Sequence, residues 1–401
     1  TKDGYAVAKD SVDGFWKYAQ PSKSRAGFDI IANAKVGTAS PSKLMIRKHD
    51  LPEKGLLGAK MESKRAARDG MSVGEPSVGL PGAKSSSAGE VSSPGTPGQG
   101  GIPASGVTTV KNIVILASFN DHWDSTNSTV LASKGRVTVS EYTNLFNETN
   151  HTTDGAVGSV KDYYKEVSYN KLTVSSTVTV WVHLPSNESV YGGNDSYGDD
   201  TNPRQMVTDA INAADAAGFD FSQGDSDGDG WVDCLTVIHS GFGEEYSGNP
   251  ANCIWSHQWE LTAPITKDGV SMRRYHTEPA LRGSASSSTS IIRIGVICHE
   301  MGHFFGLPDL YDYSGTTAGV GNWSIMAQGS WNGSLGSRPA HFCAYCKYML
   351  GFVSPQQIHS LASVSLPRVE DNAVVHLYRD GMSNGEYYLI ENRANYGFDN
   401  D

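Results

Sequence analysis

Between residues 107 and 241, the apolar positions follow strand spacing and helical spacing in turn. We predict strands for "KNIVILAS" at 111–118, for the Thr/Val alternation at 172–184, which is a strand or a hairpin, and for "VDCLTVIHSG" at 232–241. We predict helices over 158–172, with Ser159 as N-cap and Asp162 in the first turn, and over 203–218, between Pro203 and Gly218. Elements in this order predict an α+β (mixed α/β) fold, with helices packed on a twisted mixed sheet.

A further helix is predicted in "STSIIRIGVICHEMGHFFG" at 288–306. Its apolar residues recur at helical spacing, at Ile291, Ile294, Ile297, Cys298 and Met301. A serine or threonine at the start of the segment is the expected N-cap. We therefore expect a helix with one buried face, which follows the sheet in the sequence.

The first hundred residues have a different composition. Residues 1–40 begin with an aromatic, turn-rich segment that is typical of the end of a small β unit. Residues 41–106 contain too little apolar surface to offset their ordering entropy, which predicts a flexible linker. The pair Lys64-Arg65 within it is a candidate processing site. Structured sequence resumes at Val107.

Composition and charge restrict the possible partners. The chain has 401 residues, of which 38% are hydrophobic and 19% are charged, so it can form one large globular domain or two ordinary ones. A net charge of −11 argues against nucleic-acid and anionic-membrane partners, because both require a basic surface. No apolar run approaches the roughly eighteen residues of a membrane span. The chain starts at Thr1 rather than methionine, which is compatible with a trimmed signal peptide.

Glycosylation sequons indicate a secreted chain. They occur at Asn127, Asn147, Asn150, Asn187, Asn194, Asn322 and Asn332. The cysteines are odd in number, at Cys234, Cys253, Cys298, Cys343 and Cys346. We predict a disulfide between Cys234 and Cys253, and we expect Cys343 and Cys346 to lie too close on a helix to bridge easily. The motif "HFCAYC" could bind a metal, but no second half matches it, so we interpret it as packing.

Candidate chemistry is concentrated in "CHEMGHFFGLPDLYD". His299 and His303 are four residues apart, so on a helix both imidazoles can reach one zinc ion at about 2.0–2.1 Å. Glu300 points to the side of this pair, where it can take a proton from a zinc-bound water. For the other histidines, including His239 and His257, we expect ordinary packing.

The residues after the helix supply a third ligand. Gly306 can adopt a positive φ, so the helix can end there and the chain can turn back. This turn brings Asp309 to the same ion. Three protein ligands leave one coordination position open, which is typical of a catalytic rather than a structural zinc site.

The spacing His299-Glu300-x-x-His303-x-x-Gly306-x-x-Asp309 resembles the extended motif of metzincin zinc peptidases, in the variant with aspartate as third ligand. "GNWSIMAQGSWNG" is similar to their Met-turn, which would place Met326 as an apolar floor beneath the metal. Within the metzincins, the chain resembles the immune-inhibitor-A-like family of secreted metallopeptidases. The segments that carry this likeness are "DGYAVAKDSVDGFWKYA", "GSVKDYYKEVSYNKLTVSSTV", "DSDGDGWVDCLTVIHSGFGEE" and "EYYLIENRANYGFDND".

The resemblance implies a zymogen. Residues 1–40 would be the C-terminal part of its propeptide and 107–401 its zinc metallopeptidase catalytic domain, cut short at Asp401. Two features depart from the pattern. Gln328 occupies the position where some metzincins carry a tyrosine that stabilises the oxyanion, so the resemblance assigns no residue to that role. No cysteine precedes Cys234, so latency would depend on another ligand, such as a carboxylate.

A second acidic cluster lies in "DSDGDGWVD". Its aspartates occupy positions one, three, five and nine of a calcium loop, at Asp225, Asp227, Asp229 and Asp233. Thr236 stands at position twelve, where a bidentate glutamate is expected. The motif predicts either a structural calcium site or an acidic surface turn.

These observations favour a secreted zinc endopeptidase that hydrolyses proteins or peptides, with Glu300 activating a zinc-bound water. One alternative is a secreted calcium-binding adhesion or binding protein with a non-catalytic zinc site, in which Glu300 would have no function. A thermolysin-like peptidase with a distant glutamate ligand is disfavoured, because Gly306 and Asp309 supply the third ligand locally. The sequence predicts neither the cleaved bond nor the oligomeric state.

Overall fold

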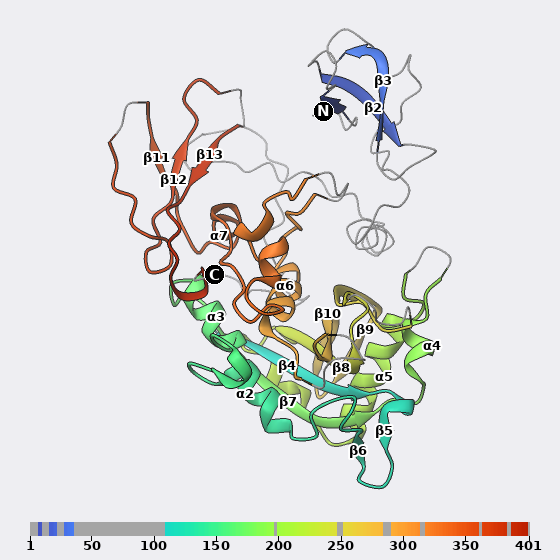
Figure 1. The fold of residues 1–401 in the computed structure, drawn as a ribbon. Helices are drawn as coiled ribbons and strands as arrows, with labels where there is room; N and C mark the ends of the chain where they lie inside the picture. The colour runs from blue at the N-terminus through green and yellow to red at the C-terminus, as the bar shows by residue number, and fades with distance from the viewer. Residues whose placement is uncertain are drawn as a thin grey trace. The chain divides into compact units, whose positions relative to one another are not determined.

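The computed structural model describes residues 7–9, 16–21, 28–35, 109–195, 199–246, 252–283, 290–312, 317–360, 363–382 and 386–399 (Figure 1). The chain divides into two compact units, which comprise residues 1–72 with 311–319 and residues 73–310 with 320–401. The predicted linker at 41–106 and its processing site lie outside the described residues. None of the described helices is long and apolar enough to cross a bilayer.

In the first unit, three strands form an antiparallel sheet of order β1-β2-β3. They are β1 (Val7–Lys9), β2 (Trp16–Pro21) and β3 (Phe28–Lys35). This agrees with the β unit expected from the composition of this segment. Its assignment to a propeptide stays a prediction.

The second unit contains the remaining strands and helices. The strands are β4 (Thr109–Ser118), β5 (Trp123–Asp124), β6 (Thr129–Val130), β7 (Thr173–His183), β8 (Cys234–Phe242), β9 (His257–Lys267), β10 (Val270–Leu281), β11 (Gln356–Ile358), β12 (His376–Tyr378) and β13 (Tyr388–Ile390). The α-helices are α2 (Val139–Asn147), α3 (Val160–Val167), α4 (Glu188–Gly192), α5 (Pro203–Ala216), α6 (Ile294–Phe304) and α7 (Ala344–Met349). The 3-10 helices are η1 (Asn120–His122), η2 (Thr153–Gly155), η3 (Phe221–Gly224), η4 (Gly321–Trp323), η5 (Gln328–Trp331) and η6 (Gly397–Asp399).

The central sheet has the strand order β7-β4-β8-β10-β9. Neighbouring strands from β7 to β10 pair in parallel, whereas β9 pairs antiparallel with β10 through a tight turn at Asp268 and Gly269. The predicted mixed α/β fold with a mixed sheet is therefore confirmed, and 172–184 forms one strand rather than a hairpin. The pair β9–β10 was not predicted.

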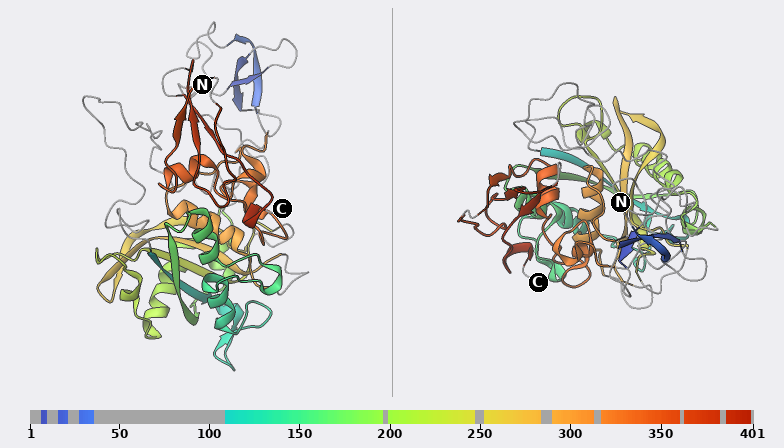
Figure 2. Two further views of the ribbon diagram at one scale, coloured as in Figure 1. Left: turned by 90° about the vertical axis from the view of Figure 1, so that its left-hand side faces the viewer. Right: turned by 90° about the horizontal axis from the view of Figure 1, so that it is seen from above.

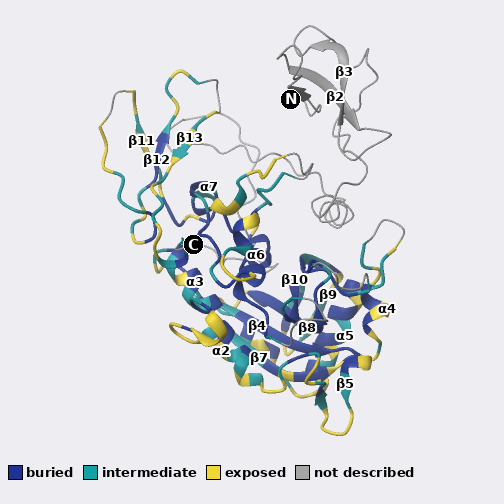
Figure 3. Cartoon of the chain, viewed as in Figure 1, coloured by how far each residue is buried: buried dark blue, intermediate teal, exposed yellow. Residues whose placement is uncertain are grey.

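Strand β4 separates two hydrophobic layers, because its side chains alternate between the faces of the sheet. Val114 and Leu116 pack with residues of α2, α3 and α6 on one face. Ile113 and Ile115 pack with the apolar residues of α5 on the other. The strand is buried along most of its length (Figure 3), as expected from its continuous apolar run. Helices α5 and α6 thus lie on opposite faces of the sheet.

The helix boundaries confirm two of the three predicted starts. Helix α3 begins with a full capping box between Ser159 and Asp162, and α5 begins at Pro203. The predicted serine or threonine N-cap of α6 is wrong. The N-cap is Arg293, because Ile291 is held in a β-bridge to Leu281 and the helix cannot start earlier.

The segment after α6 forms a separate layer. Helix α7 is followed by a small sheet of order β11-β12-β13. The views in Figures 1 and 2 agree that α6 and α7 lie between this small sheet and the central sheet. Helix α6 is consequently enclosed from both sides, and all of its residues are buried.

The predicted Cys234–Cys253 disulfide is also wrong, since all five cysteines are free. Cys234 is the first residue of β8, where its thiol lies 3.7 Å from Nε2 of His276. Cys253 lies instead beside Glu188, and burial together with the charge of Glu188 raises the pKa of its thiol. The two cysteines therefore contact different partners.

The capping box predicts a stability difference between two helix starts. Ser159→Ala removes the hydroxyl that accepts the N–H of Asp162, and should cost about 1 kcal/mol, a fall in Tm of about 2–4 °C. Thr138→Ala is the matched control, because Thr138 is the N-cap of α2 without a side-chain cap bond. Thermal unfolding followed by circular dichroism measures both. Equal shifts in the two variants would show that the Ser159 cap contributes nothing.

Candidate metal centre

The three predicted zinc ligands converge on one point. His299 and His303 stand one turn apart on α6, with their Nε2 atoms 3.1 Å from each other. Oδ1 of Asp309 lies 3.2 Å from Nε2 of His299 and 2.9 Å from Nε2 of His303. The side chains of these residues are at most 8% exposed. The geometry is that of three donors facing a common centre.

Backbone carbonyls orient both imidazoles. Nδ1–H of His299 donates to the carbonyl of Ile325 at 2.7 Å. Nδ1–H of His303 donates to the carbonyl of Leu307 at 2.8 Å. A carbonyl can only accept, so each ring carries a proton on Nδ1 and leaves Nε2 facing the centre. This is the tautomer that a metal ligand requires.

The turn after α6 brings Asp309 back. Gly306 has a φ of 94°, a left-handed conformation that favours glycine, and its N–H donates to the carbonyl of His303 at 2.8 Å. Leu310 then donates its N–H to the carbonyl of Met326 at 2.7 Å. The predicted role of Gly306 as a turn residue is confirmed, and Asp309 is held from both sides.

The cluster attracts positive charge. Burial lowers the pKa of His299, but the hydrogen bond that His299 donates to Asp309 and the charges of Glu300 and Asp309 outweigh it and raise this pKa to about 9. Burial raises the pKa of Asp309, yet the two histidines hold it well below its usual value. Without a metal, the cluster binds a proton between the imidazole and the carboxylate. A cation can occupy the same place.

Met326 packs directly against α6. It is fully buried, and a Cβ placed on Gly302 would lie only 2.6 Å from its sulfur. Gly302 therefore allows the close approach of α6 and the turn at 324–327. The same turn supplies the Ile325 carbonyl that orients His299. Gln328 begins η5 and is exposed.

A buried polar chain behind α6 was missed in the sequence. Thr236 donates to Asn112 at 2.9 Å, so its single hydroxyl proton is used and it accepts from Nε2–H of His276 at 2.8 Å. Nδ1 of His276 is then an acceptor, 2.7 Å from Glu278. Burial, with the charges of Glu300 and Glu245, raises the pKa of Glu278 well above its usual value, so this carboxyl keeps its proton and donates. Burial likewise lowers the pKa of His276 to about 3.

Because His276 and Glu278 are both neutral, they change the electrostatic surroundings of Glu300 little. A protonated Glu278 adds no second negative charge beside Glu300, which is itself only 4% exposed. Arg274 caps the opposite end of the helix by donating to the carbonyl of His303 at 3.3 Å and lies over the Phe304 ring. Strand β10 thus supports α6 without placing a further negative charge beside Glu300. A buried His–Glu pair leaves no periodic signal in the sequence.

The sequence from 102 to 352 matches the family model described as immune inhibitor A peptidase M6, catalytic domain. The chain belongs to the immune inhibitor A peptidase M6 family. The match contains all of the predicted zinc-site residues: His299, Glu300, His303, Asp309 and Met326.

Curated relatives agree with this assignment. The chain is 34% identical over 218 residues to immune inhibitor A of Bacillus thuringiensis subsp. alesti, which covers 47% of the chain and 31% of that protein. It is 33% identical over 217 residues to the pre-pro-metalloprotease PrtV of Vibrio cholerae serotype O1 strain M66-2, which covers 48% of the chain and 23% of that protein. The matched region thus spans less than a third of either relative.

The acidic loop at 225–233 converges only in part. Asp225, Asp227 and Asp229 can place one oxygen each within 4.8 Å of one another. Asp233 does not join them, and its calcium role stays a prediction. Its Oδ1 accepts the N–H of Ser226 and its Oδ2 accepts the N–H of Lys111 at 2.8 Å, so it closes the loop onto β4.

Position twelve of the loop is unsuitable as a ligand. Thr236 is fully buried in β8 and belongs to the polar chain behind α6. The loop therefore offers three exposed or half-buried carboxylates, without the bidentate glutamate of a full calcium loop. Calcium stays a prediction.

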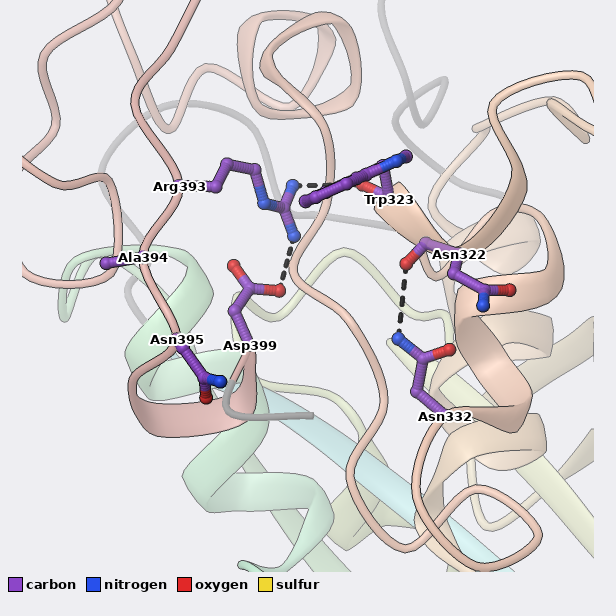
Figure 4. Close-up of a pocket in the computed structure, with 7 residues that line it drawn as sticks. All are labelled: Asn322, Trp323, Asn332, Arg393, Ala394, Asn395 and Asp399. Atoms are coloured by element: carbon purple, nitrogen blue, oxygen red, sulfur yellow. Dashed lines mark hydrogen bonds and ion pairs between the residues drawn. The ribbon is translucent and has the colours of Figure 1, made fainter.

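A cavity of about 330 Å³ lies beside the Met-turn rather than at the ligands (Figure 4). It is lined by Asn322, Trp323, Asn332, Arg393, Ala394, Asn395 and Asp399. Arg393 forms an ion pair with Asp399 and donates to the carbonyl of Trp323 at 3.0 Å. This cavity marks where the C-terminal segment is tied to η4.

A double variant of the acidic loop tests whether its negative charges bind calcium. Asp227→Asn with Asp229→Asn keeps the Oδ1 acceptors for the N–H groups of Asp229 and Trp231 but removes two negative charges. If calcium binds, each tenfold increase in its concentration above Kd should add about 1.4 kcal/mol to the free energy of unfolding of the parent, and nothing to the variant. Thermal unfolding in calcium and magnesium series measures this, with zinc content as control. An equal response of the variant would place calcium elsewhere.

Proposed function

We propose that this chain is a secreted zinc-dependent endopeptidase of the metzincin type, made as a zymogen. The convergence of His299, His303 and Asp309, with both imidazoles fixed in the ligand tautomer, is the observation that carries the proposal. The relatives named metalloprotease and the peptidase family model support the same activity.

The donor set fits zinc. Two imidazole nitrogens and one carboxylate oxygen are ligands that Zn²⁺ prefers, and three protein ligands leave a position for water or substrate. Calcium and magnesium favour sites made of oxygen atoms, so the histidines argue against them here. When bound in such a site, Zn²⁺ polarises a carbonyl and lowers the pKa of a water molecule.

Glu300 would serve as the general base. It follows the ligand His299 on α6, is buried, and lies near the neutral Glu278. One of its carboxylate oxygens accepts a proton from the attacking water and returns it to the leaving amine. An unpaired buried charge is costly, so a carboxylate kept beside the ligands favours catalysis over the non-catalytic alternative.

Secretion and glycosylation are proposed from the sequons. Asn127, Asn150, Asn187 and Asn322 are exposed and can carry glycans. Asn147 is a poor acceptor, because its amide donates to the carbonyl of Ser176 and accepts the N–H of the same residue. A glycan there would separate α2 from β7.

The catalytic assignment is tested with Glu300→Gln. The amide keeps the size of the side chain but cannot take the proton, so kcat on a protein substrate should fall by about 10²–10⁴-fold. Zinc content should stay at the parent's level. Metal analysis and hydrolysis of a broad protein substrate, with and without a chelator, are the measurements. Parent-like turnover in the variant would overturn the mechanism.

The ligand assignment is tested with His303→Ala against His359→Ala. The first variant removes a ligand and should lose zinc and activity together. The second changes a histidine whose side chain is 70% exposed, bonded to Asp380, and should keep both. Tight stoichiometric zinc in His303→Ala would show that the ligands are wrongly assigned.

Activation is tested by limited trypsin treatment. The composition of the linker and the pair Lys64-Arg65 predict cleavage within 60–106 before the catalytic domain is cut, and hydrolytic activity should rise as the uncut chain disappears. N-terminal sequencing of the fragments locates the cut. If activity stays constant after a clean cut and removal of the released piece, residues 1–106 contain no inhibitory propeptide.

A further inference from the structure

The motif "HFCAYC" gains a new interpretation from its place in the fold. Cys343 is the N-cap of α7, with an extended backbone, and Cys346 lies in the first turn of the helix. Cys343 therefore stands outside the helix, contrary to the expectation that both cysteines share it. The two sulfur atoms lie 3.8 Å apart. In a disulfide bond this distance would shorten to roughly 2.05 Å.

The two thiols differ in exposure and acidity. Cys346 is fully buried, whereas Cys343 is partly exposed. The hydrogen bond between the two thiols lowers the pKa of Cys343 to about 6. The N–H of Cys346 and the side chain of Ser324 also lower it, whereas burial and the charge of Glu391 raise it. Hydrogen bonding to Cys343, with burial, raises the pKa of Cys346 well above its usual value. One thiol is thus suited to attack and the other to resolve.

Cys343 opens onto a cavity of about 430 Å³. The cavity lies between α7 and the β13 region, and its other walls are Ala344, Tyr345, Tyr387, Leu389 and Glu391. A small disulfide-containing molecule can reach the sulfur of Cys343 through this cavity, whereas Cys346 stays buried. The other three cysteines are buried, so Cys343 is the reactive one among the described residues.

We propose that Cys343 and Cys346 form a redox-active pair that exchanges between dithiol and disulfide with an external low-molecular-weight disulfide. The Cys343 thiolate attacks one sulfur of that reagent, which forms a mixed disulfide and releases one thiolate. Cys346 gives its proton to solvent and attacks the sulfur of Cys343, which forms the internal disulfide and releases the second thiolate. Two protein thiols are oxidised and one external disulfide is reduced.

The pair is linked to the metal centre through Ser324. Ser324 lies beside both cysteines and lowers the pKa of each thiol, and its hydroxyl accepts the N–H of Met326 at 3.3 Å. The next residue, Ile325, supplies the carbonyl that orients His299. Disulfide formation would consequently change the surroundings of a residue in the turn at 324–327.

The exchange is measured on the full chain in buffers of reduced and oxidised glutathione, by acid quenching, alkylation and mass spectrometry. As the oxidised fraction rises, both thiols should disappear together, with a mass loss of two hydrogen atoms that reduced glutathione reverses. Cys346→Ser should stop at one glutathione on Cys343 per chain, and Cys343→Ser should take up none. Cys253→Ser, which removes a buried cysteine elsewhere, should behave like the parent.

Three results would overturn the proposal. One is a parent protein whose two thiols stay reduced in the most oxidised glutathione buffer. This result is obtained without any variant, so it does not depend on a variant that folds. A second is equal uptake of glutathione by Cys343→Ser and Cys346→Ser. The third is a pair that alkylates only after treatment with a chelator, which would mean a thiolate metal site. Because thiols are counted rather than peptide hydrolysis, the result does not depend on the proposed peptidase activity.

Discussion

Two hydrogen bonds from imidazole to backbone determine what the candidate centre can do. Nδ1–H of His299 is held by the carbonyl of Ile325, and Nδ1–H of His303 by the carbonyl of Leu307. Both acceptors lie on segments that follow α6, so the helix alone cannot set the tautomers. The Met-turn and the turn at Gly306 must pack correctly before the two Nε2 atoms face Asp309. The ligand set is a product of tertiary packing as much as of motif spacing.

That packing depends on how β10 supports α6. The strand places Glu278 and His276 against the helix, and their hydrogen bonds are consistent only if both are neutral. A charged Glu278 would repel Glu300 in a poorly solvated place, whereas a protonated one satisfies His276 at no electrostatic cost. Arg274 from the same strand bonds to the last turn of the helix. Strand β10 thereby fixes the position of α6 without adding net negative charge.

The strands and helices with regular apolar spacing could be predicted from the sequence, and so could the convergence of His299, His303 and Asp309. The run at 111–118 and the fixed offsets from His299 to Asp309 depend on local periodicity, which the chain records directly. Strand β10 could not be predicted, because its ionisable residues give it the sequence pattern of an exposed polar segment. Only their hydrogen-bond partners in the structure explain why they are buried. The prediction of the α6 N-cap was wrong for a related reason. The helix start is set by the bridge between Ile291 and Leu281, a tertiary contact that the local sequence pattern does not show.

The two carboxylate-containing clusters show why spacing alone does not identify a metal site. Both bring three donor groups within 4.8 Å, and both match a known motif. In the acidic loop, Asp225 already accepts the N–H groups of Gly228 and Gly230, and water reaches the neighbouring aspartates. These bonds stabilise the turn with no ion. In the centre on α6, the side chain of Asp309 is 4% exposed and faces two imidazoles whose Nδ1 atoms bond to backbone carbonyls, so a shared proton or a metal cation can balance its charge. Burial and outer hydrogen bonds, rather than the number of carboxylates, therefore distinguish a site that favours a bound cation from a loop that tolerates one.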